Sequence, residues 1–161
     1  MNPMEIKSIF SEYKSLDELI PKEVNLVKNA IESSKKAYAP YSTFKVGAAL
    51  LLANNEIIQG NNQENAAYPS GLCAERIAVF YANAKYPDTT IITLAITARK
   101  NDKIIKHPFS PCGSCLQVLL ETEKRFEQNI EIILYGSEKI IKASNVEQFL
   151  PLNFDRKSMK E

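Results

Sequence analysis

Residues 44–52 read Phe-Lys-Val-Gly-Ala-Ala-Leu-Leu-Leu, from Phe44 to Leu52. Valine, alanine and leucine occupy both faces of this stretch, so it is predicted to be a central strand buried on both sides. Asn54-Asn55 is predicted to form a hairpin turn, and Ile57-Ile58-Gln59 starts the strand that returns. A strand of this kind needs a covering layer on each face of its sheet.

Helical patterns flank this hairpin. Pro21 begins the first helix, whose apolar side chains recur at helical spacing up to Tyr38. Ala39-Pro40 ends it, because a residue before proline is disfavoured in helical conformation. Further helices are predicted at residues 73–86 and 112–126, and further strands at residues 91–98, 130–134 and 139–142. Two strands followed by alternating helices and strands predict an α/β domain with a mixed central sheet and helices on both faces.

The composition is that of one folded domain. The chain has 161 residues, of which 45% are hydrophobic and 24% charged, and this excludes wholesale disorder. Its 20 Lys and Arg residues against 19 Asp and Glu residues give a net charge of +1, which argues against nucleic-acid binding through many phosphates. The longest apolar run, Val46 to Ala53, is too short to span a membrane, and no secretory segment follows Met1, so we expect a cytoplasmic protein.

Three parts of the chain differ in pattern. Residues 1–20 show no clear period and are predicted to be an N-terminal extension, residues 21–154 to be the domain, and residues 155–161 to be a polar tail. The connection from Arg99 to His107 is basic and is predicted to be a solvated loop. His107, the only histidine, is interpreted as structural.

The three cysteines point to a metal site. An odd number of cysteines without an export signal does not fit a disulfide framework. Cys112 and Cys115, in Pro111-Cys112-Gly113-Ser114-Cys115, share one helix face at the start of a helix, and Cys73 heads the other helix. Helix N-termini favour thiolates. Three such ligands leave the fourth zinc position open for water, which is the catalytic arrangement.

Two neighbours of Cys73 add chemistry to this site. Glu75, which flanks the same helix end, is predicted to carry protons in a hydrolytic reaction. Arg76 is predicted to donate a hydrogen bond to a ligand sulfur and so offset the negative charge of three thiolates on Zn²⁺.

Each motif also has an alternative interpretation. Cys-Gly-Ser-Cys alone fits a redox pair, and a lone Cys73 fits a buried small residue. A non-catalytic zinc module is a further alternative, which needs His107 or a carboxylate as a fourth ligand. The combination Cys-Ala-Glu and Pro-Cys-x-x-Cys, each at the head of a helix, favours the zinc-deaminase signature.

At these residues the chain resembles the cytidine deaminase family, in its short, three-cysteine form. Four ordered segments carry the resemblance: Ala39-Pro40-Tyr41-Ser42-Thr43-Phe44-Lys45-Val46-Gly47-Ala48-Ala49-Leu50, Gly60-Asn61-Asn62-Gln63-Glu64-Asn65-Ala66-Ala67-Tyr68-Pro69, Cys73-Ala74-Glu75-Arg76 and Ser110-Pro111-Cys112-Gly113-Ser114-Cys115-Leu116-Gln117. A weaker match is Leu150-Pro151-Leu152-Asn153-Phe154. The resemblance implies a three-layer cytidine deaminase-like fold and a homotetramer.

The resemblance also implies the reaction. Cys73, Cys112 and Cys115 would hold one zinc ion per chain, and Glu75 would be the proton shuttle. The substrates would be small nucleosides, cytidine and deoxycytidine, hydrolysed to uridine and deoxyuridine with release of ammonia in pyrimidine salvage. We expect no organic cofactor, no nucleic-acid partner and no membrane partner.

Further residues are assigned to the substrate by the same resemblance. Asn62 and Glu64 would hydrogen-bond the ribose hydroxyl, and their i, i+2 spacing puts both side chains on one side of an extended segment. Phe44 would pack on the pyrimidine ring, and the Ala74 amide would meet the base carbonyl. Phe154 would approach the site of a neighbouring subunit.

Departures from the family pattern and other substrates complete the prediction. Lys45 stands where many relatives carry proline, and Leu116 where the family often has arginine. Alternative substrates are a polynucleotide base, free cytosine and an aminopyrimidine antibiotic. The near-neutral charge disfavours polynucleotides, and the Asn62/Glu64 pair disfavours free cytosine.

Overall fold

The computed structural model describes residues 1–159, so positions 160 and 161 of the predicted polar tail lie outside the described residues. The strands are β1 (Ser11–Tyr13), β2 (Phe44–Leu52), β3 (Ile57–Asn61), β4 (Ile91–Lys100), β5 (Lys103–Ile104), β6 (Glu131–Tyr135) and β7 (Ile140–Ala143). The α-helices are α1 (Pro21–Lys35), α2 (Ala74–Lys85) and α3 (Gly113–Phe126). Within the described chain, no helix has both the length and the apolar character needed to cross a bilayer.

All of these strands belong to one mixed sheet. Its order is β1-β7-β6-β4-β2-β3, with β5 paired to β4. The β4–β6 pair is parallel, and the other pairs are antiparallel. The predicted hairpin is confirmed, because β2 pairs with β3 around a turn in which Asn55 has a φ of 66°. The parallel pair is joined through α3, which places the start of α3 beyond the carboxyl end of β4.

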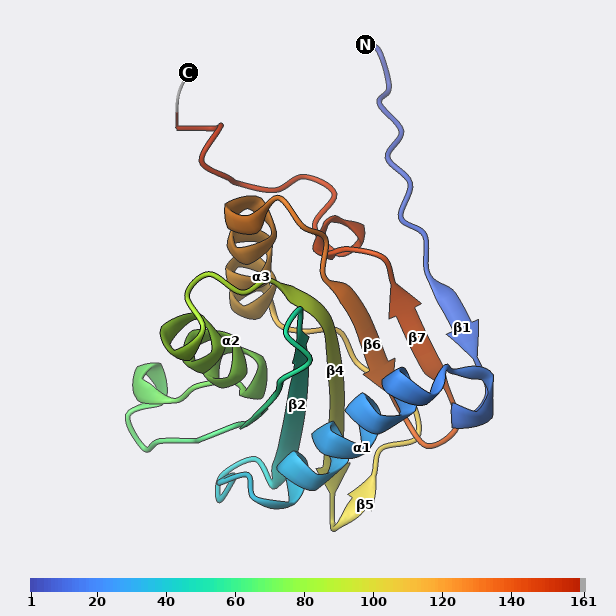
Figure 1. The fold of residues 1–161 in the computed structure, drawn as a ribbon, viewed down its shortest axis with the longest axis vertical. Coiled ribbons are helices and arrows are strands. Elements are labelled where there is room, and N and C mark those ends of the chain that lie inside the picture. The colour runs from blue at the N-terminus through green and yellow to red at the C-terminus, as the bar shows by residue number, and fades with distance from the viewer. Residues whose placement is uncertain (160–161) are drawn as a thin grey trace.

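The predicted three layers are confirmed, with α1 on one face of the sheet and α2 and α3 on the other (Figure 1). Alternate side chains of β2 pack into the two hydrophobic cores, one on each face of the sheet. Ala48 and Leu50 belong to the core under α2 and α3, whereas Ala49 and Leu51 belong to the core under α1. The apolar character of β2 on both faces is therefore explained by one helical layer on each side.

Two glycines let the helices approach the sheet. A Cβ atom at Gly47 would lie 2.1 Å from the Ala30 carbonyl oxygen in α1. A Cβ atom at Gly60 would lie 2.3 Å from the Ala74 carbonyl oxygen in α2. These contacts are backbone contacts, so any side chain at either position would push a helix away from the sheet.

The structure corrects three expectations about local structure. The first helix ends at Lys35 and not at Ala39, because Tyr38 exchanges backbone hydrogen bonds with Asn62 and Glu64. The N-terminal segment contains β1, which pairs with β7 at the edge of the sheet. The basic connection is shorter than expected, because β4 runs to Lys100 and pairs with β5.

Candidate active site

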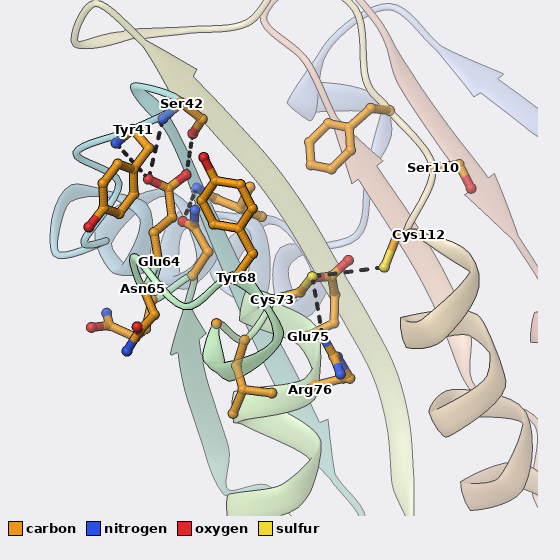
Figure 2. A pocket seen from close by; sticks show the side chains of 16 residues that line it. Tyr41, Ser42, Glu64, Asn65, Tyr68, Cys73, Glu75, Arg76, Ser110 and Cys112 are labelled. Carbon is orange, nitrogen blue, oxygen red and sulfur yellow. Dashed lines mark hydrogen bonds between the residues drawn. The ribbon is translucent and has the colours of Figure 1, made fainter.

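A cavity of about 650 Å³ lies at the N-terminal ends of α2 and α3. Figure 2 shows its wall, which is built from the loop before β2, the loop after β3, the start of α2 and the segment before α3. The lining residues are Tyr41, Ser42, Val46, Asn62, Gln63, Glu64, Asn65, Tyr68, Gly71, Leu72, Cys73, Glu75, Arg76, Phe109, Ser110 and Cys112. The structure thus brings together residues that the sequence predicted for metal binding, catalysis and sugar recognition.

The three cysteine sulfurs form a cluster beside this cavity. Cys73 and Cys112 are the N-cap residues of α2 and α3, and Cys115 lies in the first turn of α3. The Sγ atoms of Cys73 and Cys112 are 3.8 Å apart, and those of Cys112 and Cys115 are 3.5 Å apart. All three sulfurs lie within 4.8 Å of one another.

This geometry fits zinc. Tetrahedral Zn–S bonds of about 2.3 Å separate neighbouring sulfurs by about 3.8 Å. The extended backbone of Cys73 and Cys112 at the two caps aims both side chains across the helix ends, where unpaired N–H groups favour thiolates. The three sulfurs are the whole cluster of metal-ligating side chains found among residues 1–159. Three protein ligands would leave one position of a tetrahedral zinc ion for water.

Hydrogen bonds among these groups change their acidity. Hydrogen bonds from the Cys115 thiol and, to a smaller extent, from the Arg76 guanidinium lower the pKa of the Cys73 thiol to about 5. Arg76 Nη2 lies 3.9 Å from Cys73 Sγ. The pKa of Cys115 is raised by the same bond to Cys73 and by burial. Arg76 therefore lies against the sulfur whose pKa is lowered (Figure 2).

Glu75 is a buried carboxyl group at the floor of the cavity. It is only 3% exposed, although it lies in the first turn of α2. Burial raises the pKa of the Glu75 carboxyl to about 7, and the negative charge of Cys73 adds to the rise. A carboxyl group of this kind can both accept and donate a proton near neutral pH.

Asn62 and Glu64 form the opposite side of the cavity. Both side chains are held by hydrogen bonds to residues 41–46, which are the loop before β2 and the start of β2. Asn62 Oδ1 accepts a hydrogen bond from Val46 N (2.7 Å), and its Nδ2 donates to Phe44 O (3.0 Å). Glu64 accepts hydrogen bonds from the backbone N–H groups of Tyr41 (2.9 Å) and Ser42 (3.3 Å) and from the Ser42 hydroxyl. These donors lower the pKa of Glu64, the hydroxyl most of all, so that it stays ionised.

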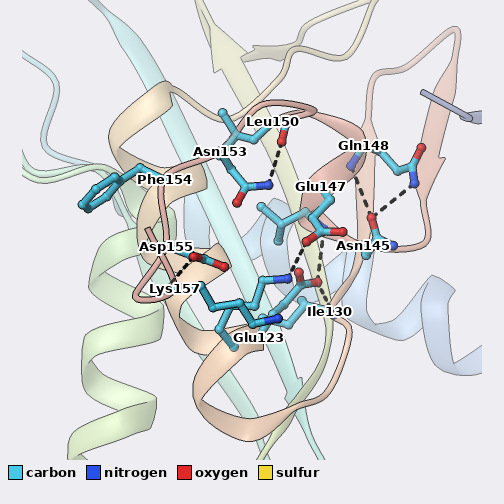
Figure 3. Close-up of polar contacts among 12 residues, drawn as sticks. Glu123, Ile130, Asn145, Glu147, Gln148, Leu150, Asn153, Phe154, Asp155 and Lys157 are labelled. Carbon is cyan, nitrogen blue, oxygen red and sulfur yellow. Dashed lines mark hydrogen bonds and ion pairs between the residues drawn. The ribbon is translucent and has the colours of Figure 1, made fainter. Parts of the chain in front are cut away.

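Phe44 and Ala74, which were predicted to contact the substrate, are not among the residues that line the cavity, and neither is Phe154, which was predicted to approach the site of a neighbouring subunit. Phe44 packs edge-on against Phe109, with ring centroids 5.5 Å apart, and Phe109 lines the cavity in its place. Ala74 is fully buried at the first position of α2. Phe154 is 59% exposed, and its carbonyl accepts a hydrogen bond from Gln117 Nε2 (2.9 Å). In Figure 3 its ring points away from the polar contacts of the C-terminal segment.

Phe109 and Ser42 are among the wall residues to which the sequence assigned no role. Phe109 immediately precedes the Ser110-Pro111-Cys112 segment, and this proximity to the cysteine motif could have indicated that it lies in the cavity wall. Ser42 lies in a segment that carries the family resemblance, but its partner Glu64 is 22 residues away. The spacing of the two residues gave no sign of this contact.

The remaining residues singled out from the sequence lie elsewhere. Lys45 is 3.9 Å from the Asp102 carboxylate, in an exposed ion pair. Leu116 is buried in the core under α2 and α3. His107 is exposed and lies outside the sulfur cluster.

Three sulfur ligands with an open fourth position beside a buried carboxyl group are the parts of a zinc-dependent deaminase site. The sequence profile described as "Cytidine and deoxycytidylate deaminase zinc-binding region" matches residues 21–127. A cytidine deaminase of Halalkalibacterium halodurans is 35% identical over 136 residues, which cover 84% of this chain and 96% of that protein. A cytidine deaminase of Sporosarcina psychrophila is 34% identical over 83% of this chain and 92% of that protein.

The fold gives the same result. The crystal structure of cytidine deaminase from Burkholderia pseudomallei superposes with a TM-score of 0.67 at 33% identity, covering 81% of this chain and 97% of that one. The chain therefore belongs to the cytidine and deoxycytidylate deaminase family, and it is an enzyme of that class.

Proposed function

We propose that the protein catalyses the zinc-dependent hydrolytic deamination of cytidine and deoxycytidine to uridine and deoxyuridine, with release of ammonia. The observation that carries this proposal is the meeting of three cysteine sulfurs and the buried Glu75 at one cavity. Relatives that align over more than nine-tenths of their own length are cytidine deaminases. The reaction would serve pyrimidine salvage in the cytoplasm.

The sulfur cluster would hold one zinc ion per chain. Zinc bound there supplies a hydroxide nucleophile at neutral pH, because it lowers the pKa of water. Arg76 would offset the charge of the thiolates through its hydrogen bond to Cys73.

Glu75 would move the protons. It takes one proton from the attacking water and passes it to the ring nitrogen next to the carbon that carries the amino group. It then moves the proton of the new hydroxyl group to the amino nitrogen, which leaves as ammonia. Burial suits Glu75 to both steps, because it brings the pKa of the carboxyl close to neutral pH.

The other side of the cavity supports recognition of a sugar. The Asn62 amide nitrogen carries two protons, and Phe44 O accepts one of them. A sugar hydroxyl can accept the second proton and donate its own to the Glu64 carboxylate. The N–H of Ala74, at the first position of α2, has no acceptor within its own helix and would meet the base carbonyl.

The charges of the wall favour a nucleoside over a nucleotide. Arg76 is the cationic side chain among the lining residues, and its Nη2 lies against Cys73. A phosphate on the sugar would find no other cationic side chain in the wall to balance its charge. We therefore expect cytidine to be turned over far better than its 5′-monophosphate.

A homotetramer is part of the proposal by analogy with the family. The exposed ring of Phe154, held by its carbonyl bond to Gln117, would contact the cavity of a neighbouring subunit. Light scattering of the purified protein tests the assembly, and a monomer at micromolar concentration would contradict it.

The test of the function is the loss of cytidine absorbance in the ultraviolet, on protein of measured zinc content. We expect turnover, with about one zinc per chain, and loss of turnover on chelation. Zinc-loaded protein without turnover would contradict the substrate, and other aminopyrimidines would then be assayed. A thiol titration with and without chelator separates the redox alternative, in which the cysteines react equally in both conditions.

A further inference from the structure

The Ser42 hydroxyl joins two parts of the cavity wall. It donates its single proton to Glu64 Oε1, and its oxygen accepts a hydrogen bond from Phe44 N (3.0 Å). The second bond is a local turn, in which a serine oxygen receives the N–H two residues later. This turn fixes the direction of the hydroxyl, so its proton is held toward the carboxylate.

The backbone on either side holds the second oxygen of the same carboxylate. The N–H groups of Tyr41 and Ser42 both donate to Glu64 Oε2. The loop returns toward β2 through Thr43, whose φ is 56°, and Thr43 N donates to Ala39 O (3.1 Å). A left-handed conformation is uncommon for a β-branched residue and is maintained here by the surrounding hydrogen bonds.

The three donors leave the carboxylate little freedom. An ionised carboxylate offers about four acceptor positions, and the loop occupies three of them. The donor on Oε1 is a side chain, so a substitution removes it while the Tyr41 and Ser42 N–H donors to Oε2 remain. Glu64 lines the cavity, and Ser42 lies beside it on the same wall (Figure 2).

We propose that Ser42 is a positioning residue for sugar recognition: its hydroxyl orients the Glu64 carboxylate so that the remaining acceptor position faces a sugar hydroxyl in the cavity. This inference rests on the proposed function, because it assigns Ser42 to the sugar side of that site. Ser42 acts through Glu64, so its contribution requires a substrate with a hydroxyl group for Glu64 to bind.

The experiment compares cytidine with 2′,3′-dideoxycytidine, which lacks both hydroxyl groups on that side of the sugar. We expect Ser42→Ala to lower kcat/KM for cytidine about tenfold, mainly through KM, as for the loss of one hydrogen bond to a charged group. The value for dideoxycytidine should stay within about twofold, a difference too small to represent a lost hydrogen bond. Ser42→Thr, which keeps the hydroxyl, should restore cytidine kinetics.

Thr43→Ala is the matched control. Its hydroxyl donates to Ser42 O in the same loop and makes no hydrogen bond to Glu64, so its removal should leave the ratio between the two substrates unchanged. Zinc content and Tm are measured for each variant.

If Ser42→Ala loses activity equally on both substrates, or loses none on cytidine, the inference is overturned. Turnover of cytidine by the wild-type protein would still support the proposed function in that case. No turnover of cytidine by zinc-loaded wild-type protein would overturn both.

Discussion

The two sides of the cavity are built in different ways. The cysteine side, Cys73, Cys112 and Cys115 with Glu75, is attached to the ends of two helices that pack on the sheet. The loop side, Ser42, Asn62 and Glu64, lies in irregular segments and is held by hydrogen bonds between side chains and backbone. The positions of the residues on the cysteine side are therefore fixed by helix packing, and those on the loop side by hydrogen bonds among the loop residues themselves.

The difference separates chemistry from recognition. Groups that move protons or hold a metal need fixed positions, and helix ends anchored in a core provide them. Groups that read a ligand must face solvent before the ligand arrives, and here side-chain hydrogen bonds fix their positions. Substitutions on the cysteine side should therefore affect the chemical step, and substitutions on the loop side should affect binding.

The largest expected effect is on the cysteine side. Glu75→Gln keeps the volume of the side chain but removes its ability to carry a proton, so we expect kcat to fall about 100- to 10,000-fold. Zinc content should remain at the wild-type value, because Glu75 is outside the sulfur cluster. Steady-state kinetics and metal analysis on the same sample check both statements, and near-wild-type turnover would remove Glu75 from the proton path.

On the loop side, Glu64→Ala should lower kcat/KM for cytidine about 10- to 100-fold, since a hydrogen bond to a charged group is lost. Activity on free cytosine, which has no sugar, should change little. The matched control is Gln59→Ala, in β3 outside the cavity lining, whose amide donates to Asn29 Oδ1. Equal loss on cytidine and cytosine would show that Glu64 supports the wall without reading the sugar.

Arg76→Ala tests how much the guanidinium contributes to metal binding on the cysteine side. The lost hydrogen bond to Cys73 leaves the thiolate charge without its partner, so we expect zinc affinity to fall about 10- to 100-fold. Competition with a chromophoric chelator measures it. Arg125→Ala, which removes an exposed guanidinium bonded to Pro87 O, is the control and should keep wild-type affinity.

The smallest effect concerns a contact outside the cavity. Ser33 Oγ, fully buried in α1, donates to Gly60 O in β3 (2.6 Å). Ser33→Ala should lower the free energy of unfolding by about 1 kcal/mol, with kcat/KM unchanged. Chemical denaturation measures the change, and Ser34→Ala, whose hydroxyl bonds only within its own helix at Ile31 O, is the comparison.

The sequence predicted those parts of the fold that depend on local pattern. The strand at residues 44–52 was recognisable because its apolar residues occupy both faces, and Asn55 marked the hairpin because it tolerates a positive φ. The predicted end of α1 was wrong, because Tyr38 fits a helical period but pairs instead with Gln63, in the loop after β3. β1 was missed because three largely exposed residues carry no period and gain their structure from β7.

The same distinction holds for the site. Cys73, Glu75, Cys112 and Cys115 are close to helix starts, and short motifs report such positions. The Ser42–Glu64 contact depends on how two loops meet, which no short motif records. The Phe44–Phe109 contact likewise joins two segments that are distant in sequence, with Phe109 lining the cavity.

The sulfur cluster also has a consequence for how the chain folds. Cys112 and Cys115 are close in sequence, but Cys73 lies 39 residues before Cys112, so the third sulfur joins them only when both helices have docked on the sheet. An unfolded chain offers a metal ion two neighbouring thiols, and the folded chain offers three. Zinc at a thousand times its dissociation constant would then add about 4 kcal/mol to the free energy of unfolding. An ion held for catalysis would in this way also fasten α2 to α3, and the melting temperature would rise with the zinc concentration.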